Sequence, residues 1–276
     1  MSVIQALVIA VLQGATELFP VSSLGHAVIL PHLLGWTVNQ KAPDFLPFLV
    51  VLHLGTATAL LLYFWRDWWG FAKAVFGHGD GDAVRRERKI FWLICAATVP
   101  AAVIGFTLEH KLRGFFGAPQ LAAVFLIVNG FILFVGEKIK HAGRKSLDEV
   151  GVVAALVIGA CQALALIPGI SRSGAAMVGG VMAGLTHKEA ARFSFLLATP
   201  IIAGAGVLEV PKLLHAHGAI AYNGGMVALA GVAAGVTAYA STAALMHYFK
   251  KNEIEALKPF AYYCWAVGLA SLLLMG

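Results

Sequence analysis

An arginine flanked by two serines is the first feature of this sequence that needs a chemical explanation. Residues 167–174 read Ile-Pro-Gly-Ile-Ser-Arg-Ser-Gly and stand between two apolar runs. Arginine near the centre of a membrane span is unfavourable by about 2.5 to 3.5 kcal/mol, so it usually faces a partner, a water-filled cavity or a ligand. Its guanidinium is a fork suited to phosphate or carboxylate. With Ser171, Ser173 and the free N–H groups near Gly174, Arg172 predicts an anion site, and a plain helix N-cap is the alternative.

A second polar break, residues 13–26, supplies a candidate partner for this arginine. Gln13 and Glu17 are four residues apart, so on a helix they share one face and can converge on one ligand or metal ion. A carboxylate at membrane depth is costly, and either Arg172 or a bound cation would offset that cost. Gln13 and Glu17 are therefore candidate metal ligands.

Two serines and a histidine follow in the same break. Ser22, Ser23 and His26 offer hydroxyl groups and an imidazole, which can act as nucleophile and as acid or base, and Ser22 can also bind phosphate. The alternative is structural: Glu17 and Arg172 would only lock two segments together, and His26 would be a hydrogen-bonded core residue. Four costly groups at two matched breaks exceed what packing requires, so we interpret Glu17, Ser23, His26 and Arg172 as catalytic candidates.

The composition places these groups inside a membrane. The 276 residues are 59% hydrophobic and 12% charged, against about 25% charged in ordinary soluble domains. No stretch is long and polar enough for a separate soluble domain, so we expect a single membrane domain, residues 1–276. The formal net charge of +6 indicates cytoplasmic loops and contact with the lipid bilayer rather than nucleic acid. Cys95, Cys161 and Cys264 lack paired metal spacing and argue against a disulfide framework.

The apolar segments predict an all-α, polytopic integral membrane protein. A span needs about 20 residues, and about six segments predict full transmembrane helices. The pairs 1–36 and 151–185 differ, because each consists of two apolar runs around a Pro-containing polar break. We interpret them as re-entrant helix-loop-helix hairpins, with two complete crossings as the alternative. Either arrangement returns the chain to its starting side.

The basic residues then orient the protein. Counting spans places the loops after residues 65, 136, 185 and 248 on one side, and by the positive-inside rule that side is the cytoplasm. Both termini would lie outside. These loops hold fifteen of the 20 Lys and Arg: Arg66, Lys73, Arg85, Arg86, Arg88, Lys89, Lys138, Lys140, Arg144, Lys145, Lys188, Arg192, Lys250, Lys251 and Lys258. The other side receives Lys41, Lys111, Arg113 and Lys212.

A hairpin followed by three spans occurs twice, which predicts an inverted-topology repeat. Its halves would be about residues 1–137 and 151–276, joined by a basic cytoplasmic loop, and the site of such repeats commonly lies where the broken hairpins meet. Three residues of the first break recur 149 positions later, Gln13 as Gln162, Ser22 as Ser171 and Gly25 as Gly174. The sequence therefore predicts that the two breaks form one site.

The stretches 13–26 and 168–176 resemble the two signature motifs of the bacterial undecaprenyl-diphosphate phosphatases, the bacitracin-resistance family. The resemblance covers essentially the whole chain, including Phe193-Ser-Phe-Leu-Leu-Ala-Thr-Pro200. It implies a hydrolase that removes the terminal phosphate of undecaprenyl diphosphate and so recycles the lipid carrier of cell-wall synthesis. It also implies a place in the bacterial inner membrane, a divalent cation, Mg²⁺ or Ca²⁺, and a site open to the periplasm.

Residue roles follow from the motif positions. Gln13 and Glu17 match the family's Glu/Gln-x-x-x-Glu element, Ser23 and His26 match its Ser and His, and Arg172 matches its phosphate-binding Arg. These matches imply the same roles in this chain.

Three positions depart from the family pattern. Leu24 and Ala176 stand where Thr is usual, and His53 stands where Gln often stands. The departures weaken any claim that these positions do chemistry. We expect His53 to be a packed or hydrogen-bonded histidine of an apolar span, with a role in lining the site as the alternative.

The mechanism and one alternative function stay open at this point. We expect Arg172, a cation near Glu17 and helix-end N–H groups to neutralise the diphosphate while Ser23 or His26 attacks the terminal phosphorus, with metal-bound water as a third attacking group. The alternative function is a transporter or flippase of an anionic prenyl lipid, because inverted repeats and broken helices are typical of transporters. The sequence also leaves open whether the protein is a homodimer.

Overall fold

The computed structural model describes residues 1–40, 45–77, 81–113, 118–139, 143–215 and 224–275. Within these ranges the side chains of residues 108–113, 139, 209 and 212–215 are not described. Of the basic residues counted above, Lys41 and Lys140 lie outside the described residues, as do the side chains of Lys111, Arg113 and Lys212.

The described residues are helical almost throughout, which confirms the all-α prediction. Six helices are long and apolar enough to cross a membrane, and they are α3, α5, α6, α9, α10 and α11. The predicted number of full spans is therefore confirmed by length and composition. The elements are α1 (Val3–Thr16), α2 (Ser23–Leu33), α3 (Phe45–Tyr63), α4 (Trp65–Phe76), α5 (Asp82–Arg113), α6 (Pro119–Ile139), the 3-10 turn η2 (Leu147–Glu149), α7 (Val152–Ala163), the 3-10 turn η3 (Leu164–Leu166), α8 (Arg172–Met182), α9 (His187–His215), α10 (Gly224–Lys251) and α11 (Lys258–Met275).

The four helices of the two polar breaks are much shorter than the spans. Helices α1, α2, α7 and α8 have 14, 11, 12 and 11 residues. At about 1.5 Å per residue the longest of them reaches about 21 Å, less than the hydrocarbon thickness of about 30 Å. These lengths favour the hairpin interpretation over two complete crossings. Their re-entrant insertion from one side of the membrane stays a prediction.

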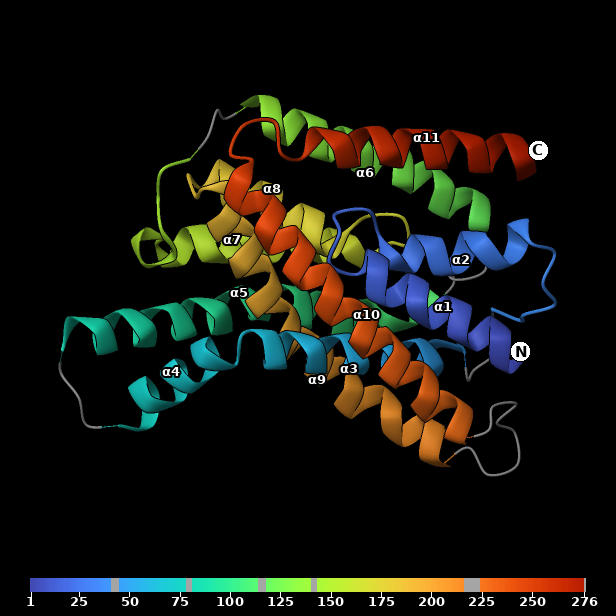
Figure 1. Ribbon diagram of the computed structural model, residues 1–276, viewed down its shortest axis with the longest axis horizontal. Helices are drawn as coiled ribbons and strands as arrows, with labels where there is room; N and C mark the ends of the chain where they lie inside the picture. Colours follow the sequence, from blue (N-terminus) through green and yellow to red (C-terminus); the bar gives the residue numbers. More distant parts are fainter. Residues whose placement is uncertain (41–44, 78–80, 114–117, 140–142, 216–223, 276) are drawn as a thin grey trace.

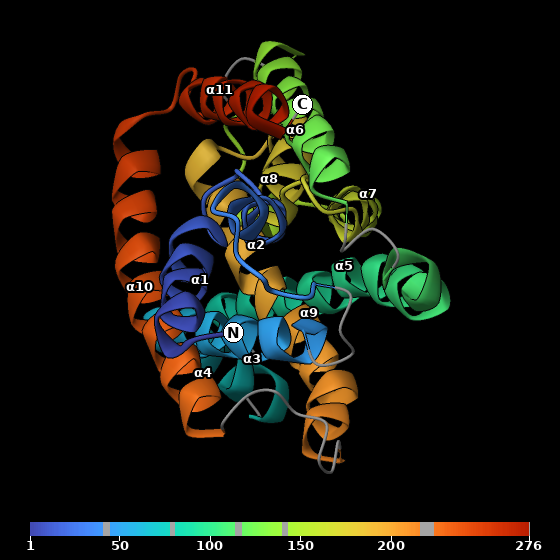
Figure 2. The same ribbon diagram turned by 90° about the vertical axis from the view of Figure 1, so that its right-hand side faces the viewer.

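Each hairpin packs against a helix of the other half of the chain. Helix α1 lies along α10, and α7 lies along α5. Figure 1 shows α6 and α11 side by side along one edge of the molecule, where they contact each other. In Figure 2, α1, α2 and α8 lie inside the ring made by α10, α11, α6, α5 and α3. These matching partners support the predicted inverted repeat, and they bring the two breaks into the protein interior.

The four segments that carry most of the basic residues lie together at one end of the molecule. Side chains from each of them pair with groups of another, which holds the ends of α3, α6, α9 and α10 together. The contacts are those of Arg192 with Asp67, of Lys89 with the Asp148 carbonyl, and of Glu137 with both His187 and the Leu257 amide. The span count therefore groups these segments correctly.

The two breaks touch at a pair of glycines. A β-carbon on Gly25 would lie 3.0 Å from the Gly169 α-carbon. Gly169 has a φ of +105°, and a β-carbon there would lie 2.3 Å from the Ala122 carbonyl oxygen. L-residues rarely adopt such a φ, so glycine satisfies both the backbone conformation and the close approach.

Hydrogen bonds from a buried asparagine join the same breaks. Asn129 of α6 is fully buried, its Nδ2 donates to the Pro20 carbonyl at 2.9 Å, and its Oδ1 accepts from the Ser171 amide at 2.9 Å. The Oγ of Ser22 accepts from the Gly169 amide at 3.2 Å. Non-helical backbone at membrane depth needs partners of this kind. Asn129 and Ser22 therefore fix the two breaks relative to each other.

We predict that Gly169→Ala destabilises the protein more than Gly35→Ala. Both positions have positive φ, but nothing lies within 4 Å of a β-carbon at Gly35. Gly35→Ala therefore adds only backbone strain, about 1 to 2 kcal/mol, whereas Gly169→Ala adds a clash with backbone. The melting temperatures in detergent, followed by intrinsic fluorescence, measure the difference. Equal melting temperatures for the two variants would show that the contact at Gly169 does not restrict the fold.

Candidate functional site

Two helices begin at the site, and each begins with a serine cap. Ser22 caps α2 and accepts from the Gly25 amide at 3.2 Å, and Ser171 caps α8 and accepts from the Gly174 amide at 3.1 Å. Ser22 has a φ of 66°, which is uncommon for a residue with a side chain and often found at functional sites. The caps make Ser23 and Arg172 the first residues of their helices. Both residues thus stand at the positive end of a helix dipole.

Glu17 is the centre of the contacts between the breaks. Its side chain is 5% exposed and its Oε1 accepts from Arg172 at 2.9 Å (Nη2) and 3.2 Å (Nε). The third contact of the guanidinium runs from Nη1 to the Ser194 carbonyl at 3.4 Å. The structure therefore joins the carboxylate of the first break to the arginine of the second. A single buried charge is costly, so each residue stabilises the other.

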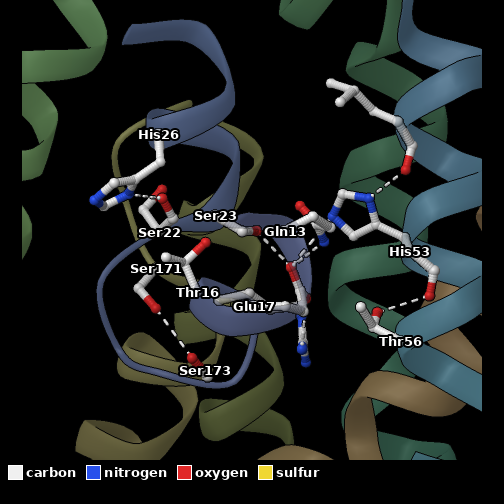
Figure 3. A network of polar contacts seen from close by, with 12 residues as sticks. Gln13, Thr16, Glu17, Ser22, Ser23, His26, His53, Thr56, Ser171 and Ser173 are labelled. Carbon is white, nitrogen blue, oxygen red and sulfur yellow. Dashed lines mark hydrogen bonds and ion pairs between the residues drawn. The ribbon is translucent and has the colours of Figure 1, made fainter. Parts of the chain in front are cut away.

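The second oxygen of Glu17 accepts hydrogen bonds from Ser23 and Gln13 and forms an ion-pair contact with His53, as Figure 3 shows. Ser23 Oγ lies 2.5 Å from Oε2, Gln13 Nε2 lies at 2.9 Å, and His53 Nε2 lies at 3.3 Å. The Ser23 hydroxyl donates to a carboxylate, which is the arrangement in which a carboxylate can accept a proton from a nucleophile.

His53 was expected to be a packed or hydrogen-bonded histidine, with a site-lining role as the alternative, and the structure shows it both hydrogen-bonded and in the cavity lining. It lies on α3, and its Nδ1 is 2.8 Å from the Leu49 carbonyl while its Nε2 faces the Glu17 carboxylate. Both partners accept hydrogen bonds only, so the geometry fits the doubly protonated imidazolium. The one sequence feature that could have indicated a site residue here is a histidine inside an apolar span. Nothing in the sequence relates position 53 to Glu17, because α3 forms its own continuous helix.

His26 lies apart from this cluster. The residue is 7% exposed. Its Nδ1 lies 2.7 Å from the Ser22 carbonyl, and its Nε2 lies 2.9 Å from the Tyr263 hydroxyl of α11. Figure 3 shows His26 on the far side of α2 from Glu17 and His53. Its predicted catalytic role stays a prediction, and the structure does not bring the ring to the carboxylate.

Ser173 and Gly174 lie behind the site rather than in it. The Oγ of Ser173 donates to the Phe19 carbonyl at 3.1 Å and lies 3.1 Å from the Ser171 Oγ. Gly174 contributes its amide to the cap of α8. These groups link the two breaks through hydrogen bonds. A direct contact of Ser173 or Gly174 with a ligand stays a prediction.

A cavity of about 220 Å³ lies over this cluster. Its polar lining comes from both breaks and from α3, and its apolar lining comes mostly from α3 and α9. A lining that combines charged groups with aliphatic side chains suits an amphiphilic ligand. The polar residues are Glu17, Ser22, Ser23, His53, Ser171 and Arg172, and the apolar ones are Leu24, Leu46, Leu49, Val50, Ala165, Leu166, Ile170, Ile201, Ile202 and Ala205.

The fold and the cavity define a class: a multi-pass membrane protein with a cavity, lined by a buried Glu–Arg pair, between two broken helical hairpins. The family model described as bacitracin resistance protein BacA matches residues 6–270, and the chain belongs to that family. The undecaprenyl-diphosphatase of Granulibacter bethesdensis is 55% identical over 99% of this chain and 96% of its own length. The undecaprenyl-diphosphatase of Acidiphilium cryptum is 51% identical over 98% of this chain and 97% of its own length. Undecaprenyl-diphosphatase 2 of Chromobacterium violaceum is 50% identical over 99% of each chain.

The donors around Glu17 leave few free ligands for the predicted divalent cation, whose binding there stays a prediction. Among the described residues, no group of three or more His, Cys, Asp or Glu side chains converges as a metal site. Glu17 is the one carboxylate in the cavity lining, and both of its oxygens already accept from N–H or O–H donors. Mg²⁺ and Ca²⁺ need several oxygen ligands, and Arg172 and His53 would repel them. Gln13 donates from Nε2 to Glu17, and its buried Oε1, which has no partner, is an oxygen that a cation could still use.

We predict that the ligand-free protein binds neither Mg²⁺ nor Ca²⁺ stoichiometrically at micromolar free ion. The reason is that Glu17 already has two cationic neighbours. Equilibrium dialysis of the purified protein in detergent measures the bound ion. One tightly bound ion per chain, lost in Glu17→Gln, would contradict the prediction and restore Glu17 as a metal ligand.

Proposed function

We propose that this chain hydrolyses undecaprenyl diphosphate to undecaprenyl phosphate and inorganic phosphate, and that the cavity at Glu17 and Arg172 is its active site. The observation that carries the proposal is the Ser23 hydroxyl, 2.5 Å from the Glu17 carboxylate and beside Arg172 in one cavity. Nucleophile, base and anion-binding group are thus within reach of one substrate atom. Family membership and the names of the relatives support the same reaction. It recycles the lipid carrier of cell-wall synthesis and accounts for bacitracin resistance.

Substrate binding in this proposal follows the polarity of the cavity. The diphosphate enters the end lined by Arg172 and by the helix starts at Ser22 and Ser171, where the guanidinium and the helix dipoles favour negative charge. The prenyl chain lies against the aliphatic walls from α3 and α9. A divalent cation, when present, enters as part of the diphosphate rather than on Gln13 and Glu17.

The reaction then proceeds in two steps. Ser23 Oγ attacks the terminal phosphorus while Glu17 accepts its proton, the bond to the bridging oxygen breaks, and undecaprenyl phosphate leaves. Glu17 then releases this proton to solvent. Water next attacks the phosphoserine and gives a proton to Glu17, Glu17 passes that proton to Ser23 Oγ as the bond between Oγ and phosphorus breaks, and inorganic phosphate leaves with Ser23 restored. Arg172 stabilises the charge that develops on the phosphoryl oxygens. His26 is less suited to attack, because its ring nitrogens face the Ser22 carbonyl and the Tyr263 hydroxyl.

The same proposal assigns the cavity to the periplasmic side of the inner membrane. The basic end of the molecule begins where α3 ends at Tyr63, and the lining residues Leu46 to His53 belong to the first half of α3. The cavity is therefore displaced from the basic end, which the positive-inside rule assigns to the cytoplasm. Accessibility of Ser23→Cys to a membrane-impermeant thiol reagent in spheroplasts tests this assignment, and labelling only after lysis would contradict it.

The experiment that tests the function is phosphate release from a prenyl diphosphate by the purified protein in detergent. We expect release without a membrane gradient, and we expect Arg172→Lys to lower kcat/KM by about 10²- to 10³-fold, the range for loss of one key charge-stabilising donor. Lysine keeps the charge but not the fork that reaches Glu17 and Ser194 together. Arg85→Lys, an exposed position on α5, serves as the matched control.

Two outcomes would contradict this proposal. A transporter or flippase would release no phosphate in detergent and would act only in sealed vesicles. Near-normal activity of Arg172→Lys, at normal expression, would remove Arg172 from the central role.

The proposed nucleophile predicts a phosphoserine intermediate. Rapid acid quenching of the protein with a terminally labelled prenyl diphosphate should trap label on Ser23, and Ser23→Ala should trap none. Glu17→Gln should slow formation of the label, because the amide cannot accept the hydroxyl proton. Peptide mass spectrometry locates the phosphate. Label on His26 in a parallel alkaline quench, which preserves phosphohistidine, would make the imidazole the nucleophile. A burst of phosphate without protein label in either quench would indicate attack by water.

A further inference from the structure

We propose that His53 binds the lipid-attached phosphate of the diphosphate, so that the site holds one cation for each phosphate. Arg172 takes the terminal phosphate and His53 takes the proximal one. The inference rests on the proposed function, since it assigns the second phosphate of the same substrate. It gives a substrate-contacting role to a residue that the motifs of the two breaks do not include.

The two cations flank Glu17 from opposite oxygens. Arg172 Nη2 lies 2.9 Å from Oε1, and His53 Nε2 lies 3.3 Å from Oε2. They come from different elements, α8 and α3, and both line the cavity. One carboxylate thus faces two cationic side chains, and the cluster carries a surplus positive charge. A surplus charge in a nearly buried site is costly unless an anion joins it.

The longest of the contacts that Glu17 makes is the one with His53. At 3.3 Å it is longer than the contacts of Ser23 and Gln13 with the same oxygen, 2.5 and 2.9 Å. The ring itself is fixed from its other side, because Nδ1 donates to the Leu49 carbonyl at 2.8 Å. Because the ring is held through Nδ1, its Nε2–H can bind a phosphate oxygen in place of Glu17 without movement of α3.

The apolar lining determines which phosphate His53 can reach. Leu46, Leu49 and Val50 precede His53 on α3 by one to two turns, and all of them line the cavity. The facing wall is formed by α9, which packs along α3. A prenyl chain that lies between these walls brings its own phosphate to His53 first. The terminal phosphate then extends toward Arg172 and Ser23.

This position gives His53 a part in the reaction. When the bond between the terminal phosphorus and the bridging oxygen breaks, negative charge moves onto the proximal phosphate, which leaves as the lipid monophosphate. An imidazolium N–H at that phosphate stabilises this charge in the low-dielectric cavity. No proton needs to be transferred, because Glu17 already accepts the proton of Ser23.

Binding of two probes to the full-length protein in detergent tests the inference. One probe is a non-cleavable prenyl methylenediphosphonate, and the other is inorganic phosphate, which needs only the Arg172 half of the site. We expect His53→Gln to lower the affinity for the diphosphonate by about tenfold or more, as for the loss of one hydrogen bond to a charged group. The affinity for inorganic phosphate should change by less than about twofold. Glutamine can still donate to Glu17, so a structural role would be largely preserved. His53→Lys restores the charge and should recover most of the diphosphonate affinity.

His247→Gln is the matched control, because His247 is exposed on α10. Equal losses for both probes in His53→Gln, or no loss for either, would overturn the inference. A failure of the proposed function is distinguishable, since it would appear as absent phosphate release by the wild-type protein while the binding of the two probes still differs. If His53→Gln does not fold, retained diphosphonate affinity in His53→Lys supports the inference and its loss overturns it.

Discussion

The ion pair between Glu17 and Arg172 is the interaction on which the rest of this structure depends. The two residues are 155 positions apart, come from different polar breaks, and are 2.9 Å apart at their closest atoms. Either charge alone inside an apolar molecule would be costly, and removing one partner would leave the other uncompensated. The pair therefore requires both hairpins to be in place. It also leaves the cavity with a carboxylate that can accept a proton and a guanidinium that can bind an anion.

The residues around the breaks supply hydrogen-bond partners for backbone groups as well as positions for the side chains of the site. Helices that stop inside a membrane protein leave amides and carbonyls without partners. Here Asn129 serves one carbonyl of the first break and one amide of the second, and the Ser22 hydroxyl accepts from the Gly169 amide. Because the same groups join the two breaks, the arrangement that satisfies the backbone also fixes the distance between Glu17 and Arg172.

Charge balance explains why this site suits a phosphorylated lipid. Glu17 faces Arg172 and His53 together, so the cluster favours an added anion over an added cation. The aliphatic residues of α3 and α9 complete a cavity whose lining is both charged and aliphatic. This chain belongs to the bacitracin resistance family. The substrate that we propose for it likewise combines a charged diphosphate with an apolar prenyl chain.

The sequence by itself determined the class of fold, the number of spans and most of the polar site, because hydropathy, helix breakers and costly intramembrane charges are local properties. Arg172 and Glu17 were recognisable from their setting, and their partnership followed from the matched breaks. The tertiary structure alone decided the rest. It directed His26 toward Tyr263, brought His53 to Glu17, and occupied the carboxylate with N–H and O–H donors. Such contacts depend on how α3, α8 and α11 pack around the breaks, and no spacing along a single helix encodes that packing.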